Sequence, residues 1–413
     1  MKKIAILTQG AEHPGGVTTI VNGLSEWLIN NSDYQPTIIS LAESRSDPSS
    51  RRILSPKSWR TKTLINGNPD FQGEHWGVNF AEFEPFRYLP NRELTNRLNS
   101  FDLIQVVSGS LSLAFAASKA LPPTVVQAAT RISWERESQL SPLPKLERTV
   151  RRAVLAAVSY QERKAAKHVD LILAINNKFY EYVRHDLRVS SERAELLPPG
   201  IDTERFVPNL NRFANSDDYL LYMGRLNDHR KGLDRLLEAY RLMRAKVSNV
   251  PPLVLAGYGE LAQPLKSFIV DNNMSKYVRV LSNVPETELP GLFAGATLFL
   301  QASLEEGLGL SVLQSMSCGV PVIATSTDGT LETVKHGVTG YLIAQGSVGN
   351  VAKEMSDRAI FFLQNDSREM RVNSRDFVLQ RFSLQDNYLE FKKRYDEIIS
   401  RHGRNGKSVR MKG

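Results

Sequence analysis

The segment 303–325, SLEEGLGLSVLQSMSCGVPVIAT, constrains the fold more than any other part of the chain. A short loop carries Glu306 and passes through Gly307 and Gly309 into an apolar helix, and a β-branched strand follows after Pro321. Glycines before a helix let an anionic ligand approach the free backbone N–H groups at the positive end of the helix dipole. The segment therefore predicts a strand, a helix and a second strand of an α/β protein, with an anion-binding turn before the helix.

Gln314 lies within the predicted helix, eight residues after Glu306. At helical rise this spacing corresponds to roughly 12 Å along the axis. Such a separation suits two side chains that hold opposite ends of one elongated ligand, such as a sugar and a ribose.

Short apolar strands alternate with helices along most of the chain, from the strand at 4–7 to the strand at 322–323. This alternation predicts parallel sheets with helices on both faces. The prolines and glycine of the segment 197–208 mark a rigid link between two halves. A chain of 413 residues is too long for one hydrophobic core and suits two α/β domains. Residues 45–100 show no regular pattern and are expected to be irregular.

Charge and cysteine content limit the class of protein. The single cysteine, Cys318, excludes an internal disulfide and is compatible with a reducing cytosol. No apolar run is long enough to span a bilayer, and the first strand does not read as a signal peptide. The net charge of +8 gathers in the tail 403–413 and in one other stretch. The basic residues of that stretch are Arg45, Arg51, Arg52, Lys57, Arg60 and Lys62. This charge suits an anionic lipid surface, a phosphorylated acceptor or simple solvation, and no nucleic-acid-binding motif accompanies it.

The segment Glu306-Gly-Leu-Gly-Leu310, followed by Gln314-Ser-Met-Ser-Cys-Gly-Val-Pro-Val-Ile-Ala324, resembles the donor-site signature of retaining glycosyltransferases of family 4. Their pattern places two glutamates eight positions apart, and this chain has Gln314 at the second. Gly224-Arg225 and Lys231-Gly232 resemble a second family motif, and the link 197–208 resembles the PNGVDxxxFxP link with Pro199 in place of Asn. The resemblance implies the GT-B fold, in which two Rossmann-like doubly wound domains face each other across a cleft.

The resemblance also implies roles for individual residues. Arg225 and Lys231 contact the donor diphosphate, and two fixed cations there would stabilise the leaving group without a metal. Glu306 contacts the sugar, and Gln314 contacts the ribose as an uncharged hydrogen-bond partner. The remaining substrate-binding residues implied on the donor side are Gly257, Gly259, Asn283, Val284, Gly307, Gly309 and Leu310. No cofactor is expected beyond the nucleotide-sugar donor, and no metal spacing or DxD motif is present in the sequence.

In the first half the resemblance is looser. Gly15 and Gly16 match the glycine loop that approaches the donor phosphate. Many family members have a His after the strand at 125–126, where this chain has Gln127 to Arg131, so Thr130 or Arg131 is expected to contact the sugar or acceptor. The expected domains are 1–198, on the acceptor side, and 199–383, which binds the nucleotide sugar. A helix at 384–402 is expected to return to the first domain, and 403–413 is expected to be a disordered basic tail.

The sequence thus predicts a cytoplasmic, retaining and metal-independent hexosyltransferase of polysaccharide or glycolipid synthesis, peripheral on the membrane at most. Its expected partners are a nucleotide-diphosphate sugar and a glycan or lipid-linked acceptor. Acceptor contacts are expected within 45–100 and 127–140, where aromatic residues either bind the acceptor or fill the core. These aromatics are Trp59, Trp76, Phe83, Phe86 and Trp134. Two alternatives remain open, a nucleotide-sugar epimerase of the same fold and a nucleotide-sugar-binding module without turnover.

Overall fold

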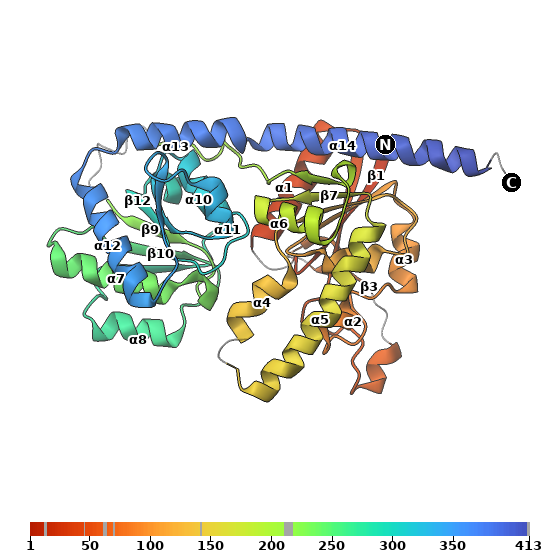
Figure 1. Cartoon of the computed structure of the whole chain (residues 1–413), viewed down its shortest axis with the longest axis horizontal. Helices are drawn as coiled ribbons and strands as arrows, with labels where there is room; N and C mark the ends of the chain where they lie inside the picture. Colours follow the sequence, from red (N-terminus) through yellow and green to blue (C-terminus); the bar gives the residue numbers. More distant parts are fainter. Residues whose placement is uncertain are drawn as a thin grey trace. The chain divides into compact units, whose positions relative to one another are not determined.

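The computed structural model describes residues 1–11, 15–44, 46–60, 64–68, 71–140, 143–209 and 218–410. The chain divides into two compact units. Unit 1 consists of Met1–Pro198 together with Tyr388–Gly413, and unit 2 consists of Pro199–Asn387. The chain therefore leaves unit 1, forms unit 2 and returns to unit 1 through its last helix (Figure 1).

Unit 1 is built on a sheet with the strand order β3-β4-β2-β1-β5-β6-β7-β8. From β4 to β8 the neighbouring strands are parallel, whereas β3 runs antiparallel to β4 at the edge. The inner strand β5 is a continuous run of buried residues, as is typical of strands covered on both faces. The strands are β1 Lys2–Gln9, β2 Tyr34–Leu41, β3 Leu64–Asn68, β4 Phe71–Trp76, β5 Leu103–Ser108, β6 Thr124–Ala128, β7 Leu171–Ala174 and β8 Ala194–Leu196.

Helices cover this sheet, and the long α5 packs against α2, α4 and η2. The helical segments of unit 1 are α1 Gly16–Asn31, η1 Pro56–Arg60, α2 Glu84–Arg87, α3 Arg92–Leu98, η2 Leu111–Ala117, α4 Ile132–Leu140, α5 Lys145–His168, α6 Asn177–Glu181, η3 Tyr182–Asp186, η4 Ser191–Arg193 and α14 Leu384–Arg410. The helical segment that follows β5 is a 3₁₀ helix, η2.

The helix α14 completes the core of unit 1 with an aromatic face. Tyr388, Phe391 and Tyr395 are all buried. The Tyr395 hydroxyl donates to the Oε1 atom of the buried Gln105 at 2.8 Å. A glycine at position 23 of α1 makes room for this helix, because a Cβ atom there would lie 2.5 Å from the Tyr388 hydroxyl.

The structure corrects two expectations about unit 1. The region 45–100 is not irregular, because it contains η1, β3, β4, α2 and α3. Its strands are short and polar, so they lack the apolar run that identifies a buried strand in a sequence. The segment 403–410, expected to be disordered, continues α14 as a helix. Extending an existing helix adds hydrogen bonds without a new nucleation cost, which offsets the low helix propensity of Gly403 and Gly406. Residues 411–413 lie outside the described part of the chain.

Unit 2 is built on a parallel sheet with the strand order β11-β10-β9-β12-β13-β14. Successive strands are added outward from β9, first on one side and then on the other. The loops that follow β9 and β12 therefore turn to opposite faces and leave a crevice at the carboxyl edge, where ligands bind in folds of this kind. The strands are β9 Leu220–Met223, β10 Leu253–Gly257, β11 Val278–Ser282, β12 Leu298–Gln301, β13 Val322–Thr325 and β14 Gly340–Ile343.

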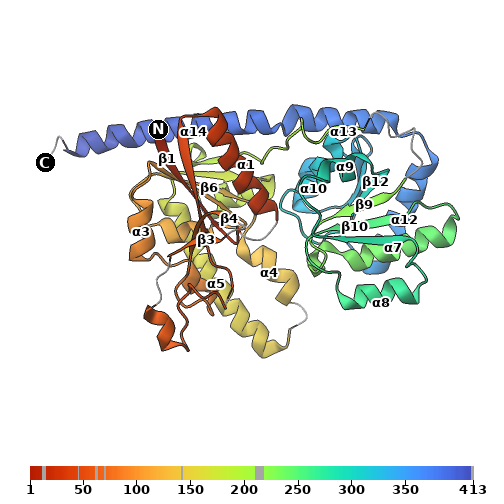
Figure 2. The same ribbon diagram turned by 180° about the vertical axis from the view of Figure 1, so that it is seen from behind.

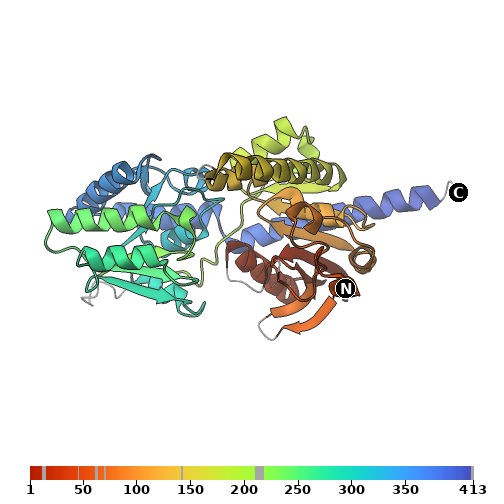
Figure 3. The ribbon, with the colours of Figure 1, turned by 90° about the horizontal axis from the view of Figure 1, so that it is seen from below.

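Two groups of helices cover the two faces of this sheet (Figures 1 and 2). On one face α7 packs against α8 and α12, which can be followed in Figure 3, and on the other α10 packs against α9, α11 and α13. The helical segments are η6 His229–Lys231, α7 Leu233–Lys246, α8 Gln263–Asp271, α9 Leu289–Ala294, α10 Leu310–Ser317, α11 Asp328–Thr333, α12 Val348–Gln364 and α13 Arg368–Arg381.

Candidate functional site

Two loops meet at the carboxyl edge of the unit 2 sheet, where β9 and β12 end. The loop after β9 leads through η6 into α7, and the loop after β12 leads into α10. Gly232 allows their close approach: its φ is +61°, and a Cβ atom would lie 2.1 Å from the carbonyl oxygen of Ala302. The backbone N–H of Leu304 donates to the Arg230 carbonyl at 2.7 Å. The backbones of the two loops are therefore in direct contact, which fixes their relative positions.

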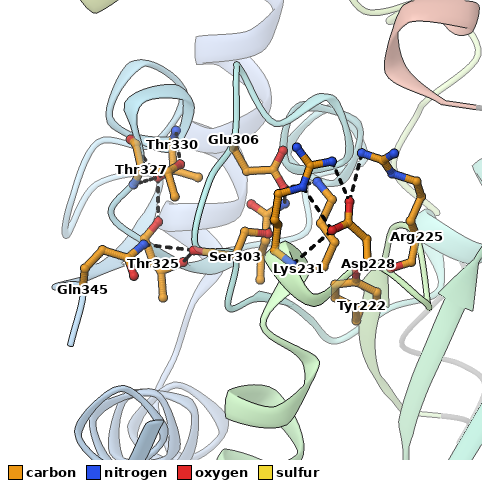
Figure 4. A network of polar contacts seen from close by, with 12 residues as sticks. Tyr222, Arg225, Asp228, Lys231, Ser303, Glu306, Thr325, Thr327, Thr330 and Gln345 are labelled. Carbon is orange, nitrogen blue, oxygen red and sulfur yellow. Dashed lines mark hydrogen bonds and ion pairs between the residues drawn. The ribbon is translucent and has the colours of Figure 1, made fainter. Parts of the chain in front are cut away.

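Lys231 and Glu306 form an ion pair between these two loops (Figure 4). The distance from Lys231 Nζ to Glu306 Oε1 is 2.6 Å, and the two side chains are only 17% and 10% exposed. Attraction between charges strengthens as water is excluded, so this pair fixes both side chains. The sequence places these residues 75 positions apart, and the fold brings them into contact.

The two carboxylate oxygens of Glu306 have different surroundings. Oε1 accepts from Lys231 Nζ, from Gln301 Nε2 at 3.0 Å and from Ser303 Oγ at 2.8 Å. Within the described residues, no donor reaches Oε2. A carboxylate oxygen that already accepts three hydrogen bonds has little capacity left, so Oε2 is the atom that can accept from a bound hydroxyl.

Asp228 holds two arginines at the end of the same loop. It forms a bidentate pair with Arg230, with Nε at 3.1 Å and Nη2 at 2.9 Å, and it contacts Arg225 Nη2 at 3.1 Å. Burial alone would raise the pKa of Asp228, but the hydrogen bonds and charge of Arg230, together with Arg225, lower it to about 2. The Arg230 side chain is only 15% exposed, so this arginine is held inside the loop and is not free at the surface. Arg225 remains 48% exposed and is the cation available to an anionic ligand.

The loops after β9, β10 and β11 interlock beside this cluster. Gly257 has a φ of +144°, and a Cβ atom on it would lie 1.8 Å from the carbonyl oxygen of Gly224. Asn283, itself in the left-handed region at φ +56°, binds both neighbouring glycines. Its backbone N–H donates to the Gly257 carbonyl at 2.6 Å, and its Oδ1 accepts from the Gly259 N–H at 3.1 Å. The expected residues Gly257 and Gly259, from the loop after β10, are thus joined by hydrogen bonds to Asn283, from the loop after β11. Val284 follows Asn283 and is partly exposed.

Gly309 is the N-cap of α10 and lies in the left-handed region, with φ +85°. Leu310 is the first residue of the helix. Glu306 and Gly307 precede the helix. Helical rise therefore separates only Leu310 from Gln314, and the expected 12 Å spacing between Glu306 and Gln314 does not apply. The Gln314 side chain is partly exposed on α10. Gln314 thus lies on the helix that starts at the site, and its distance from Glu306 does not follow from helical rise.

A second layer of polar residues, not predicted from the sequence, supports the loop that carries Glu306. The Ser303 carbonyl accepts from Thr325 Oγ1 at 2.5 Å and from Gln345 Nε2 at 2.9 Å. Gln345 in turn accepts at Oε1 from the buried Arg235, at 2.8 Å. Thr325 ends β13, Gln345 follows β14 and Arg235 lies on α7, so no local sequence pattern joins these partners.

The residues expected from unit 1 lie at the carboxyl ends of β1 and β6. Gly15 precedes α1 and Gly16 is its first residue. A Cβ atom on Gly15 would meet no atom of the described chain within 4 Å. The backbone N–H of Thr130 donates to the Gly109 carbonyl at 2.9 Å, and the Arg131 guanidinium lies 5.2 Å from the centre of the Tyr182 ring.

The buried Glu162 supports the loop that carries Thr130 and Arg131, and it was not predicted. Its side chain is 1% exposed, and its Oε1 accepts from the Ile132 N–H at 3.1 Å. Burial raises the pKa of Glu162 from 4.5 to about 7, although the Ile132 N–H lowers it in part.

This pKa predicts a pH dependence of stability. An acid whose pKa is raised by folding contributes stability below its unfolded pKa, and that contribution is lost as the pH rises through the folded pKa. We expect unfolding in urea to show a loss of roughly 3 kcal/mol between pH 4.5 and pH 8 from this group. Glu162→Gln, which keeps an acceptor for Ile132, should flatten the profile in that range. An unchanged profile in the variant would contradict the assignment.

The aromatic residues expected to contact an acceptor divide into two groups. Trp76 is 4% exposed and belongs to the core, whereas Trp59, Phe83 and Phe86 are 53%, 49% and 39% exposed. Trp134 packs edge-on against Tyr182 at 5.3 Å. Two basic residues of the same region, Arg45 and Lys62, lie outside the described residues. Core packing therefore accounts for Trp76, and the other aromatics remain candidates for contact.

Two features are absent from the described residues. No group of three or more His, Cys, Asp and Glu side chains is placed to hold a metal ion in the described ranges. None of the helices in those ranges combines the length and apolar character needed to cross a membrane.

Comparison with solved structures identifies the fold. Sucrose-phosphate synthase from Thermosynechococcus elongatus superimposes with a TM-score of 0.71 at 17% identity, covering 97% of this chain and 100% of that one. Two Rossmann-like units of this kind define the GT-B class of glycosyltransferases.

Comparison of sequences identifies the family. The family model described as Glycosyl transferases group 1 matches residues 204–375, and the model described as Glycosyltransferase Family 4 matches residues 14–205. The chain belongs to the group 1 glycosyltransferases of family 4, as the motif at Glu306 indicated.

Two curated relatives illustrate the range of this family. The GDP-mannose-dependent α-(1-6)-phosphatidylinositol monomannoside mannosyltransferase of Mycolicibacterium smegmatis is 31% identical over 182 residues, which are 40% of this chain and 47% of the relative. The UDP-Gal:α-D-GlcNAc-diphosphoundecaprenol α-1,3-galactosyltransferase of Escherichia coli is 24% identical over 258 residues, 59% of this chain and 66% of the relative. The chain thus spans less than two-thirds of the length of both.

Proposed function

We propose that the protein transfers a hexose from a nucleotide-diphosphate sugar to an acceptor hydroxyl, with retention of the anomeric configuration and without a metal. The observation that carries the proposal is the largely buried ion pair of Lys231 and Glu306 near the exposed Arg225, at the carboxyl edge of the unit 2 sheet (Figure 4). This arrangement offers cations for a diphosphate and a carboxylate oxygen for a sugar hydroxyl within one site. Family membership supports it, as do the two relatives, which are a mannosyltransferase and a galactosyltransferase named for nucleotide-sugar donors and lipid-linked acceptors.

Each residue then has a defined role. Arg225 exchanges its contact with Asp228 for a diphosphate oxygen, and Lys231 stabilises the charge that grows on the leaving group. Glu306 orients the sugar through Oε2 while Lys231, Gln301 and Ser303 hold Oε1. The acceptor hydroxyl attacks from the face that the nucleotide leaves, and an oxygen of the departing phosphate takes its proton. The hydrogen-bonded loops of Gly257, Gly259 and Asn283 suit contact with the base.

A direct test measures the release of nucleoside diphosphate from donor sugars, with and without acceptors, in buffer containing EDTA. Thermal-shift measurements with UDP, GDP and ADP would first name the base. We expect release that depends on acceptor and persists in EDTA, and a product with the donor's anomeric configuration by NMR. Binding of the donor without release or epimerisation would indicate a binding module instead, and conversion of the donor sugar alone would indicate an epimerase.

Gln314→Glu should keep or raise the affinity for the nucleotide sugar. A carboxylate accepts a hydrogen bond from a ribose hydroxyl more strongly than an amide does. Calorimetric titration with the nucleoside diphosphate identified above would measure the change. A large fall in affinity would place Gln314 against an anionic group and not against the ribose.

Peripheral attachment to an anionic membrane is a further part of the proposal. Leu54 is 90% exposed and Trp59 53%, near the exposed Lys57. In the first turns of α5, Leu146 is 80% and Val150 57% exposed, among the basic residues Lys145, Arg151 and Arg152. Figures 1 and 2 show both segments extending from the same end of unit 1. Apolar side chains flanked by cations favour the interface of anionic lipid.

Vesicle flotation tests this attachment. We expect binding to phosphatidylglycerol vesicles at low salt, weaker binding at high salt, and little binding to phosphatidylcholine. Lys57→Gln with Arg152→Gln should reduce it at least severalfold. The control variant, Lys276→Gln with Lys353→Gln, changes exposed charges of unit 2. Equal loss in both variants would indicate dependence on net charge and not on this surface.

A further inference from the structure

Unit 1 contains a polar pocket that is separate from the donor residues of unit 2. It lies beyond the carboxyl ends of β1 and β2 and has a volume of about 190 Å³. Its polar lining consists of Gln9, Glu43, Glu84, Arg87, Tyr88 and Arg136. β1 pairs with β2 on one side and with β5 on the other, so the pocket adjoins the switch point of the unit 1 sheet, where ligands bind in open α/β sheets.

The carboxylate of Glu43 lies close to the backbone of Gly10, directly after β1. Gly10 has a φ of +60°, and a Cβ atom there would lie 2.6 Å from the carboxyl carbon of Glu43. The left-handed φ favours glycine at this position. Glu43 therefore lines the pocket next to the residue that follows β1.

The contacts of the second carboxylate, Glu84, with the described residues are long. Arg136 Nη2 lies 3.4 Å and the Tyr88 hydroxyl 3.5 Å from its Oε1. The Nε atom of Arg136 is buried and has no hydrogen-bond partner in the described chain. Burial also raises the pKa of the Tyr88 phenol, so it stays protonated and able to donate. The pocket thus presents acceptors and donors that are not fully used.

The lining carries two carboxylates, of Glu43 and Glu84, and two guanidinium groups, of Arg87 and Arg136. Their charges balance. A lining without net charge does not select a phosphate. The carboxylate can accept from one hydroxyl of a sugar ring while the arginine beside it donates to the neighbouring hydroxyl, so the pair matches such a ring. Leu41, Val78 and Leu113 add an apolar wall, which suits the C–H face of such a ring.

The volume of the pocket suits a single sugar ring. The volume corresponds to roughly six water molecules and is below the range typical of sites for drug-sized ligands. We propose that this pocket binds a neutral sugar residue at the end of the acceptor glycan, with Glu84 and Arg136 as its specificity-determining residues. The inference rests on the proposed transfer reaction and adds that the acceptor is recognised through an uncharged sugar and not through a phosphate.

Acceptor kinetics and direct binding test the proposal together. Neutral methyl glycosides should serve as acceptors with a KM at least about tenfold below that of the corresponding sugar 6-phosphates. Glu84→Gln and Arg136→Met should each raise the KM for the neutral glycoside about tenfold, since each removes a charged hydrogen bond. The KM for the donor and the slow hydrolysis of the donor by water should stay unchanged. Glu147→Gln, an exposed carboxylate on α5, serves as the control.

The outcomes separate this inference from the proposed function. If wild-type protein neither transfers nor hydrolyses any nucleotide sugar, the proposed function fails, and saturation-transfer NMR with the methyl glycoside still reports on the pocket. Binding that Glu84→Gln abolishes and Glu147→Gln retains would support it. If transfer is normal and neither pocket variant changes the acceptor KM, or if the 6-phosphates are preferred, the inference is overturned.

Discussion

Lys231→Ala should lower the turnover of sugar transfer by roughly 10²–10³-fold, because it removes a preorganised charge from the departing diphosphate. The structure adds a second effect. Glu306 is 10% exposed, and losing its ionic partner leaves a nearly buried carboxylate, at a cost of about 3 kcal/mol in stability. We expect both changes, measured as nucleotide release at saturating donor and as the free energy of unfolding in urea.

Arg225→Ala is the matched comparison for this experiment. Its side chain is 48% exposed and its partner Asp228 keeps the bidentate contact with Arg230, so stability should hardly change. Turnover should fall by a similar factor as for Lys231→Ala. If both variants transfer sugar at the wild-type rate, the diphosphate is bound elsewhere.

Glu306→Ala should abolish transfer. It removes the only carboxylate that Lys231 contacts in the described chain and the Oε2 atom available to the sugar. Glu306→Gln separates the two roles, because an amide oxygen in place of Oε1 can still accept from Lys231, Gln301 and Ser303. In that variant the amide nitrogen replaces Oε2 and cannot accept from a sugar hydroxyl.

The glutamine variant should therefore still fold, with some loss of stability because Lys231 keeps a hydrogen bond but loses its ionic partner. It should bind the free nucleoside diphosphate with little change and transfer sugar at least about 100-fold more slowly. Thermal unfolding, calorimetry and the transfer assay would measure the three properties. Transfer at the wild-type rate by Glu306→Gln would show that Oε2 does not contact the sugar.

The architecture of the core was predictable because its signal is local. Apolar runs such as those of β1, β5 and β10 lie between turn residues, and their alternation with helices already indicates parallel sheets. The edge of the unit 1 sheet was missed, since β3 and β4 are short and polar and are defined by pairing with each other and with β2. The helical continuation of α14 was missed because Gly403 and Gly406 have low helix propensity, and glycine commonly marks the end of a helix.

The site was predictable to the extent that its residues lie in continuous motifs. Glu306 with its glycines, and Arg225 with Lys231, could be found from their spacing and from family resemblance. Contacts that join distant segments could not. The pair between Lys231 and Glu306, the buried state of Arg230 and the long-range support of Ser303 by Gln345 depend on which strands become neighbours. Spacing also misled where Glu306 was counted as part of a helix that begins only at Leu310.

The return of the chain to unit 1 has a consequence for synthesis on the ribosome. Residues 1–198 emerge first, yet Gln105 in their sheet receives its hydrogen bond from Tyr395, and Tyr34 donates to Asp396 at 2.7 Å. Until α14 is translated, the nascent first unit has an uncovered apolar patch around Trp27 and a core amide without its native partner. Unit 2, whose strands lie within one continuous stretch, can complete its sheet earlier. The half that is translated first is thus expected to be the half that finishes folding last.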